Sequence, residues 1–140
     1  MRAFLDSYLI VYANDGRDPK RQSMALRFID EHMRAGTGVI SIQVLQEYAN
    51  VALGKLKQAS DVVLRQLHLL EAFEVVEPVP QTVRRAVEIR QAYGISFWDA
   101  SIVAAAEQAS CDVILSEDLN AGQFYAGIPV RNPFVDEEAG

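Results

Sequence analysis

Short apolar segments alternate along this chain with longer segments of helical periodicity. Each of the first three apolar segments is followed by a stretch in which apolar residues recur at the spacing of one helix face. Parallel strands need such crossover connections, and the intervening helices then cover both faces of the sheet. The pattern predicts an α/β fold, a three-layer α/β/α sandwich with a central parallel sheet of four to five strands. The expected strands are 3–6, 38–41, 73–76, 112–115 and 129–131.

Capping residues mark where the helices begin and end. Asp18, which is followed by a proline, is typical of a helix start, and Gly36 is placed to end that helix. Ser41, Ser60 and Ser96 each precede a helical segment and are expected N-caps. The segment after Ser96 is apolar nearly all round, which predicts a helix packed deep in the protein.

Size and composition indicate a single domain. The chain has 140 residues and is 50% hydrophobic, enough for a core without disulfides or structural metals. We expect one domain over residues 1–135 and a loose acidic tail over residues 136–140. The single cysteine, Cys111, allows no intramolecular disulfide and no secretory leader is evident, so the cytoplasm is the expected compartment. No apolar run approaches the roughly 18 residues of a membrane-spanning helix, so no membrane association is expected.

The charge balance is acidic, with 13 Lys and Arg against 19 Asp and Glu and a formal net charge of −6. This balance argues against a large electrostatic footprint for nucleic acid, because phosphate contacts made by basic residues supply most non-specific affinity. It does not exclude a nucleic acid substrate, since carboxylates that bind divalent cations attract phosphate once the cations are present. The positions of the acids therefore matter more than their number.

Four acids fall where a parallel sheet places ligands, beyond the carboxyl ends of its strands. Asp6 ends the first strand, Glu47 lies on the helix after the second, Asp99 opens the apolar helix and Asp118 follows the fourth strand. Each also has a local interpretation: Asp6 as a helix cap, Asp99 as part of a capping box, Asp118 as an Asx turn and Glu47 as a surface residue. The functional interpretation comes from the four together.

Carboxylates gathered at one sheet edge repel one another unless they are protonated or neutralised by cations, and Mg²⁺ prefers such oxygen ligands. Two such ions about 3.5–4 Å apart can activate a water and stabilise the leaving oxygen of a phosphoryl displacement. The pattern therefore indicates nuclease chemistry. Ser7 and Ser116 are candidates to bind a phosphate or hold a carboxylate in place, and Glu117 is a candidate supporting residue.

These motifs resemble the PIN domain family, and in particular the toxin ribonucleases of VapBC toxin–antitoxin pairs. The order and spacing of the segments match over nearly the whole chain. The resemblance is carried by Phe4-Leu5-Asp6-Ser7 with Val11-Tyr12-Ala13, by Ser41-Ile42-Gln43-Val44-Leu45-Gln46-Glu47, by Ser96-Phe97-Trp98-Asp99-Ala100, by Leu115-Ser116-Glu117-Asp118-Leu119-Asn120-Ala121-Gly122-Gln123 and by Asn132-Pro133-Phe134.

The resemblance implies a Mg²⁺- or Mn²⁺-dependent endoribonuclease of PIN-like fold, in which Asp6, Glu47, Asp99 and Asp118 bind metal and a metal-activated water hydrolyses the RNA phosphodiester. It also implies a homodimer that is inhibited by a cognate antitoxin protein. One position departs from the family pattern, because Tyr8 stands where the family commonly has an asparagine whose amide hydrogen-bonds within the site.

Other functional classes remain as alternatives. A catalytically weak or inactive PIN-like protein that acts as a binding module would have nearly the same sequence. A phosphoacceptor receiver domain would need an acidic pair at the first strand and a lysine after the last, but the final lysine here is Lys57. Haloacid-dehalogenase chemistry would need a second acid where Tyr8 stands. Metal-dependent cleavage and metal-dependent stability distinguish the nuclease from the binding module.

Overall fold

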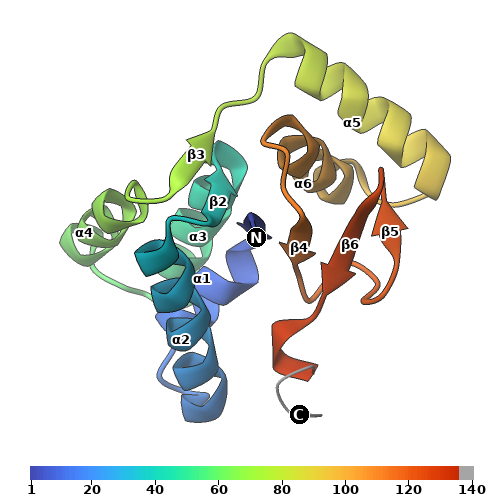
Figure 1. Ribbon diagram of the computed structural model, residues 1–140. Coiled ribbons are helices and arrows are strands. Elements are labelled where there is room, and N and C mark those ends of the chain that lie inside the picture. Colours follow the sequence, from blue (N-terminus) through green and yellow to red (C-terminus); the bar gives the residue numbers. More distant parts are fainter. Residues whose placement is uncertain (136–140) are drawn as a thin grey trace.

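The computed structural model describes residues 1–135, so the tail expected over residues 136–140 lies outside the described residues. Its strands form a six-stranded sheet in the order β3-β2-β1-β4-β6-β5 (Figure 1). The elements in chain order are β1 (Ala3–Leu5), α1 (Ser7–Ala13), α2 (Pro19–Ala35), β2 (Gly38–Ser41), α3 (Ile42–Gly54), α4 (Ser60–Leu70), β3 (Glu74–Val76), α5 (Pro80–Tyr93), α6 (Phe97–Gln108), β4 (Val113–Leu115), β5 (Phe124–Tyr125) and β6 (Ile128–Arg131).

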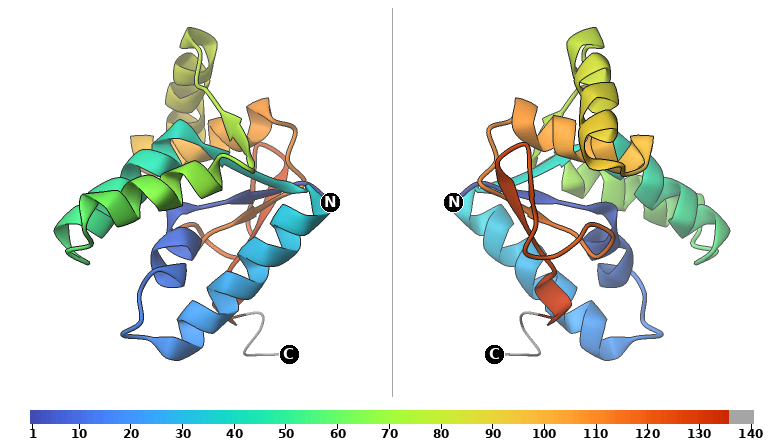
Figure 2. Two further views of the ribbon diagram at one scale, coloured as in Figure 1. Left: turned by 90° about the vertical axis from the view of Figure 1, so that its left-hand side faces the viewer. Right: turned by 90° about the vertical axis from the view of Figure 1, so that its right-hand side faces the viewer.

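The helices cover both faces of the sheet, as the alternating sequence pattern predicts. Figure 2 shows α1 and α2 on one face and α3, α4, α5 and α6 on the other. Within these layers α1 packs against α2, and α5 packs against α6. The predicted three-layer α/β fold is confirmed.

The strand order reverses at β1. The chain moves outward from β1 through β2 to β3 and then crosses back, so that β4 pairs with the other side of β1. Both neighbours are parallel to β1, and Leu5 is in register with Leu115. Such a reversal of strand order is where open α/β sheets bind ligands. The residues that follow β1 and β4 therefore meet at one edge of the sheet.

The sheet extends one strand beyond the prediction. Strands β3, β2, β1, β4 and β6 are mutually parallel, as expected, whereas β5 runs antiparallel to β6. The two-residue turn between them, Ala126 and Gly127, has positive φ at both positions, 51° and 80°. That backbone matches the right-handed twist of a tight hairpin. Tyr93 stabilises the turn, because its hydroxyl accepts a hydrogen bond from the Ala126 amide at 2.8 Å.

Most of the predicted helix ends are correct. Asp18, Ser41 and Ser96 cap α2, α3 and α6 through side-chain oxygens that accept backbone amide hydrogen bonds. Gly36 ends α2 in the left-handed conformation, with φ of 69°. The predicted cap role of Ser60 is wrong, because Ser60 is the first residue of α4 and Ala59 precedes it without a side-chain cap. A helix therefore begins at Ser60 without the hydrogen bond that its serine was expected to supply.

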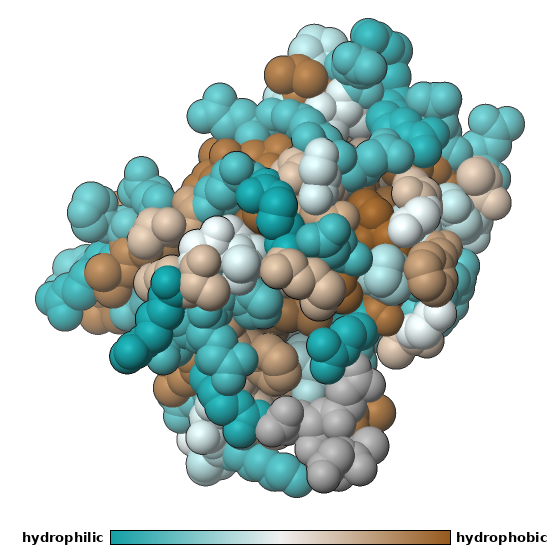
Figure 3. Space-filling view, in the orientation of Figure 1, coloured by the Kyte–Doolittle hydropathy of each residue, from teal (hydrophilic) through white to brown (hydrophobic). Residues whose placement is uncertain are grey.

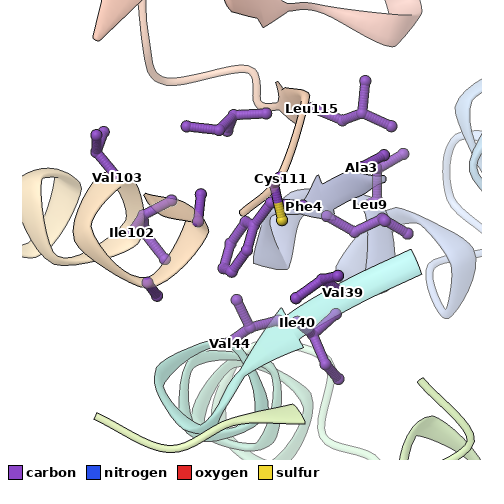
Figure 4. Close-up of a cluster of buried hydrophobic side chains, with 14 of the residues drawn as sticks. Ala3, Phe4, Leu9, Val39, Ile40, Val44, Ile102, Val103, Cys111 and Leu115 are labelled. Carbon is purple, nitrogen blue, oxygen red and sulfur yellow. The ribbon is translucent and has the colours of Figure 1, made fainter. Parts of the chain in front are cut away.

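The core lies between the sheet and its two helical layers. Figure 4 shows Phe4 of β1 and Ile40 of β2 together with Ile102 of α6, and all three are almost fully buried. Helix α6 is buried on nearly every side, as its apolar sequence predicts. Figure 3 shows hydrophobic residues in scattered groups among hydrophilic ones on the face it displays. Over the described residues, none of the helices has the length and apolar character that crossing a bilayer requires.

The close approach of β2 to Phe73 leads to a stability prediction. A Cβ added at Gly38 would lie 2.4 Å from Cε1 of the Phe73 ring, which is buried and cannot easily move away. We expect Gly38→Ala to destabilise the protein by about 1–3 kcal/mol, the usual cost of overpacking. Gly54→Ala is the control, because nothing lies within 4 Å of its added Cβ and alanine favours the helix. Urea unfolding measures both, and equal stability of the two variants would contradict the prediction.

Candidate active site

The four predicted acids come from four different elements. Asp6 follows β1 directly and is the N-cap of α1, Glu47 lies in the middle of α3, Asp99 is in the first turn of α6 and Asp118 lies in the loop after β4. Two of the local roles weighed from the sequence are also present. Asp6 accepts a hydrogen bond from the Ser7 amide, and the Asp99 amide donates to the capping Ser96. Capping and a place in a shared site are therefore compatible for both acids.

Electrostatics shows that the four acids share one environment. The pKa of Asp6, Glu47 and Asp99 is raised in each case, mainly by burial. The negative charge of Asp118 raises the pKa of all three further. Glu47 also raises the pKa of Asp6, and Asp99 that of Glu47. Asp118 is therefore the one acid whose charge acts on each of the other three.

Asp6 is the most deeply buried of these carboxylates, with 4% of its surface exposed. One oxygen, Oδ1, accepts from the Ser7 amide at 2.7 Å, and Oδ2 accepts from the Ser116 hydroxyl at 2.8 Å. Burial raises the pKa of Asp6 to about 7, even though both hydrogen bonds lower it. Near neutral pH this group is therefore poised between the protonated acid and the carboxylate that a cation binds.

The predicted supporting serines both contact the acids. The backbone of Ser7 donates to Asp6, its hydroxyl lies 3.5 Å from the same oxygen, and hydrogen bonding from Ser7 lowers the pKa of Glu47. Ser116 is buried and connects β1 to the loop after β4. Its hydroxyl donates to Asp6 and accepts from the amides of Asp118 and Leu119 at 3.2 and 3.3 Å. Ser116 thus orients two of the four acids at once.

Removing the Ser116 hydroxyl tests this role. We expect Ser116→Ala to destabilise the protein by about 1–3 kcal/mol, because two loop amides lose their acceptor. The pKa of Asp6 is expected to rise further, because the Ser116 hydrogen bond lowers it. Urea unfolding and NMR titration of the Asp6 carboxyl measure the two effects. Ser96→Ala removes the cap of α6 and a hydrogen bond that lowers the pKa of Asp99, neither of which acts on Asp6. An equal shift of the Asp6 pKa in that control would contradict the assignment.

Two hydrogen-bonded contacts at the site were missed by sequence reasoning. Gln43 lies one turn before Glu47 on α3, and its amide nitrogen donates to Glu47 Oε1 at 3.1 Å. The predicted supporting residue Glu117 points to a different partner, because its carboxylate accepts from Arg21 on α2 at 2.9 Å. The i, i+4 spacing of Gln43 and Glu47 is a signal that would have found the first contact. No local spacing identifies Arg21, which lies 96 residues away from Glu117.

Tyr8 faces the carboxylates from α1. Burial raises the pKa of Tyr8 to about 12, and the charge of Asp118 and hydrogen bonding to it add to that effect. The phenol therefore stays protonated at physiological pH and can donate one hydrogen bond to an acid. A tyrosine supplies no amide acceptor, so Tyr8 offers these carboxylates a hydroxyl donor alone.

The donor set fits a hard divalent cation. All four side chains present carboxylate oxygens, which Mg²⁺ and Mn²⁺ prefer. Burial is the main cause of the raised pKa values of Asp6, Glu47 and Asp99, and neighbouring carboxylates add a repulsion that a cation would relieve. Among the described residues, no three His, Cys, Asp or Glu side chains lie close enough together to enclose an ion. Mg²⁺ usually keeps several waters and binds one or two carboxylates together with substrate phosphates, so a closed protein cage is not required.

The chain resembles known proteins in sequence and in fold. The sequence profile of the PIN domain matches residues 3–126. A chain of a toxin–antitoxin complex from Klebsiella pneumoniae has a TM-score of 0.68 at 22% identity, covering 94% of this chain and 97% of that one. The sarcin–ricin-loop-cleaving toxin VapC20 of Mycobacterium tuberculosis has a TM-score of 0.68 at 16% identity, covering 91% of this chain and 98% of that one.

A third solved structure is VapBC2 from Rickettsia felis bound to a DNA fragment from its promoter. It has a TM-score of 0.67 at 16% identity and covers 94% of this chain and 98% of that one. At such identities these likenesses show a common fold. No curated protein matches the sequence.

Proposed function

The chain belongs to the PIN domain family, and from this premise we propose that it is a divalent-metal-dependent endoribonuclease and the toxin of a VapBC-type toxin–antitoxin pair. PIN domains are typically nucleases that use divalent metals. The observation that carries the proposal is that the charge of Asp118 raises the pKa of Asp6, Glu47 and Asp99, so acids from four elements lie within electrostatic reach of one another.

In this proposal Asp6, Glu47, Asp99 and Asp118 hold the cations. Bound Mg²⁺ or Mn²⁺ would supply the Lewis acidity that activates a water and stabilises the leaving oxygen of the phosphodiester. Ser116 holds Asp6 and the loop of Asp118 in one orientation. Gln43 orients the carboxylate of Glu47 through its amide.

The proposed protein partner is inferred from the similar structures. Three of the similar structures are toxin–antitoxin complexes, which supports a cognate antitoxin as the partner of this chain, together with an RNA substrate. A homodimer in the cytoplasm is part of the same proposal. The single cysteine, Cys111, is buried, and burial raises its pKa to about 11. A buried thiol of this kind is unreactive, which suits a reducing compartment such as the cytoplasm.

The test is cleavage of a panel of structured RNAs by the purified protein with Mg²⁺, with Mn²⁺ or with EDTA. We expect cleavage that requires metal and is lost in Asp99→Asn. Asp61→Asn is the matched control, because Asp61 also lies in the first turn of a helix but belongs to α4 and not to the carboxylate site. Absence of cleavage with either metal would overturn the proposal and favour a PIN-like binding module.

A further inference from the structure

A cavity of about 350 Å³ lies beside the carboxylate site, and the proposed chemistry does not use it. Its volume falls within the range of small-ligand pockets, roughly 300–1,000 Å³. Glu47 belongs both to this cavity and to the carboxylate site. A group held in the cavity would therefore lie next to the bond that the carboxylate site is proposed to cleave. The lining residues are Gln43, Gln46, Glu47, Asn50 and Trp98.

One wall of the cavity is a row of side-chain amides on α3. Gln43, Gln46 and Asn50 are three and four residues apart, which places them along one face of the helix together with Glu47. Gln46 and Asn50 are exposed. An amide side chain carries both donors and an acceptor, and it can therefore pair with the mixed donors and acceptors on the edge of a nucleobase.

The other wall is Trp98 in the first turn of α6. Trp98 is 65% exposed, which is unusual for the largest aromatic residue. Its backbone is fixed, because the Trp98 carbonyl accepts from the Gln43 amide at 3.1 Å. Phe97 contacts the indole edge-on, with ring centroids 5.2 Å apart. The indole is thus held at the mouth of the cavity and remains accessible, as a stacking surface for an unpaired base must be.

We propose that this cavity is a subsite for an unpaired RNA base adjacent to the cleaved phosphodiester. The base stacks on Trp98, and Gln46 and Asn50 hydrogen-bond its edge. The inference rests on the proposed nuclease function for its substrate class. A basic peptide side chain matches the cavity less well, because amides outnumber carboxylates in the lining and Glu47 already accepts a hydrogen bond from Gln43.

The single tryptophan of the chain makes the subsite directly observable. Intrinsic fluorescence of the unmodified protein is measured in EDTA and low salt, so that no RNA is cleaved. The probes are a short single-stranded oligoribonucleotide of mixed sequence, the same sequence in a duplex, and an arginine-rich peptide. We expect the single strand to quench Trp98 and the duplex to leave it unchanged, because paired bases are not available for stacking.

Variants measure the contribution of the stack. Trp98→Ala is expected to weaken binding of labelled single-stranded RNA by roughly 5- to 100-fold, and Trp98→Phe to restore most of it. In the cleavage assay the alanine variant raises KM and leaves kcat nearly unchanged, which a purely structural role would not do. Phe124→Ala is the matched control, because Phe124 is 61% exposed but lies on β5 and outside the cavity.

The outcomes separate the subsite from the nuclease proposal. Trp98-dependent binding in EDTA supports the subsite even if the metal-loaded protein cleaves nothing. Unchanged RNA binding by Trp98→Ala overturns the subsite even if the protein is an active nuclease. Quenching by the peptide without quenching by single-stranded RNA overturns it as well, and points to a protein partner at this cavity.

Discussion

Replacing Asp6 with asparagine is expected to abolish cleavage while making the metal-free protein more stable at pH 8. Asparagine keeps the shape of the side chain and its acceptor for the Ser7 amide but removes the buried charge. Loss of a charged metal ligand costs several kcal/mol of transition-state stabilisation, so we expect a fall in rate of at least about 100-fold.

The stability gain follows from the pKa of Asp6, which is raised from 3.8 to about 7 mainly by burial. Between these pH values the folded protein keeps a proton that the unfolded chain releases, so the parent loses stability as pH rises. A shift of this size corresponds to roughly 4 kcal/mol, and a weakened hydrogen bond to Ser116 offsets about 1 kcal/mol in the variant. We therefore expect the variant to gain about 3 kcal/mol at pH 8 and little at pH 4.

Urea unfolding in EDTA at the two pH values measures this gain, and the RNA panel measures cleavage. Asp61→Asn is again the control, because its carboxylate is exposed and lies on α4, which carries none of the four acids, and we expect neither effect from it. An Asp6→Asn protein that is less stable than the parent at pH 8, or that cleaves as well as the parent, would contradict the assignment of this residue.

Mg²⁺ and Mn²⁺ are expected to raise the Tm, and to raise it more at pH 8 than at pH 6. A cation that binds only the folded protein at 100 times its Kd stabilises it by about 2.7 kcal/mol, or on the order of 8 °C in a domain of this size. The ion must displace the proton from Asp6, whose pKa is about 7, so binding weakens as pH falls through that value.

Thermal unfolding with each chloride salt, against NaCl at equal ionic strength, measures this effect. The Asp6→Asn variant is expected to lose most of the shift and the Asp61→Asn control to keep it. A Tm that responds equally to Mg²⁺ and Na⁺ at both pH values would mean that the four carboxylates do not form a cation site.

Features encoded by residues close together in the chain were predictable. The caps at Asp18, Ser41 and Ser96 and the stop at Gly36 each depend on one side chain or one backbone conformation, so they were correct from sequence alone. Ser60 shows the limit of such rules. A serine at a helix start is a cap only if its backbone lies just outside the helix, and Ser60 is instead the first residue of α4.

The unpredicted strand β5, the first strand of the β5–β6 hairpin, shows a different limit. Its turn places Ala126 at a positive φ, which alanine disfavours and which no sequence rule for tight hairpins predicts. The hydroxyl of Tyr93, at the end of α5, accepts a hydrogen bond from this turn and helps to hold it. Tyr93 lies 33 residues before Ala126, so a pattern of neighbouring residues cannot predict this hydrogen bond.

The sequence alone determined every helix and strand except β5, their order, and that acids follow β1 and β4. Periodicity and capping are local, and parallel strands joined by helices leave few topologies open. Only the tertiary structure decided that Asp118 couples to the other three acids, that Ser116 links Asp6 to its loop, and that Trp98 faces the amides of α3. Burial and charge coupling depend on distances between residues that are remote in the chain, and these distances exist only after the helices have packed on the sheet.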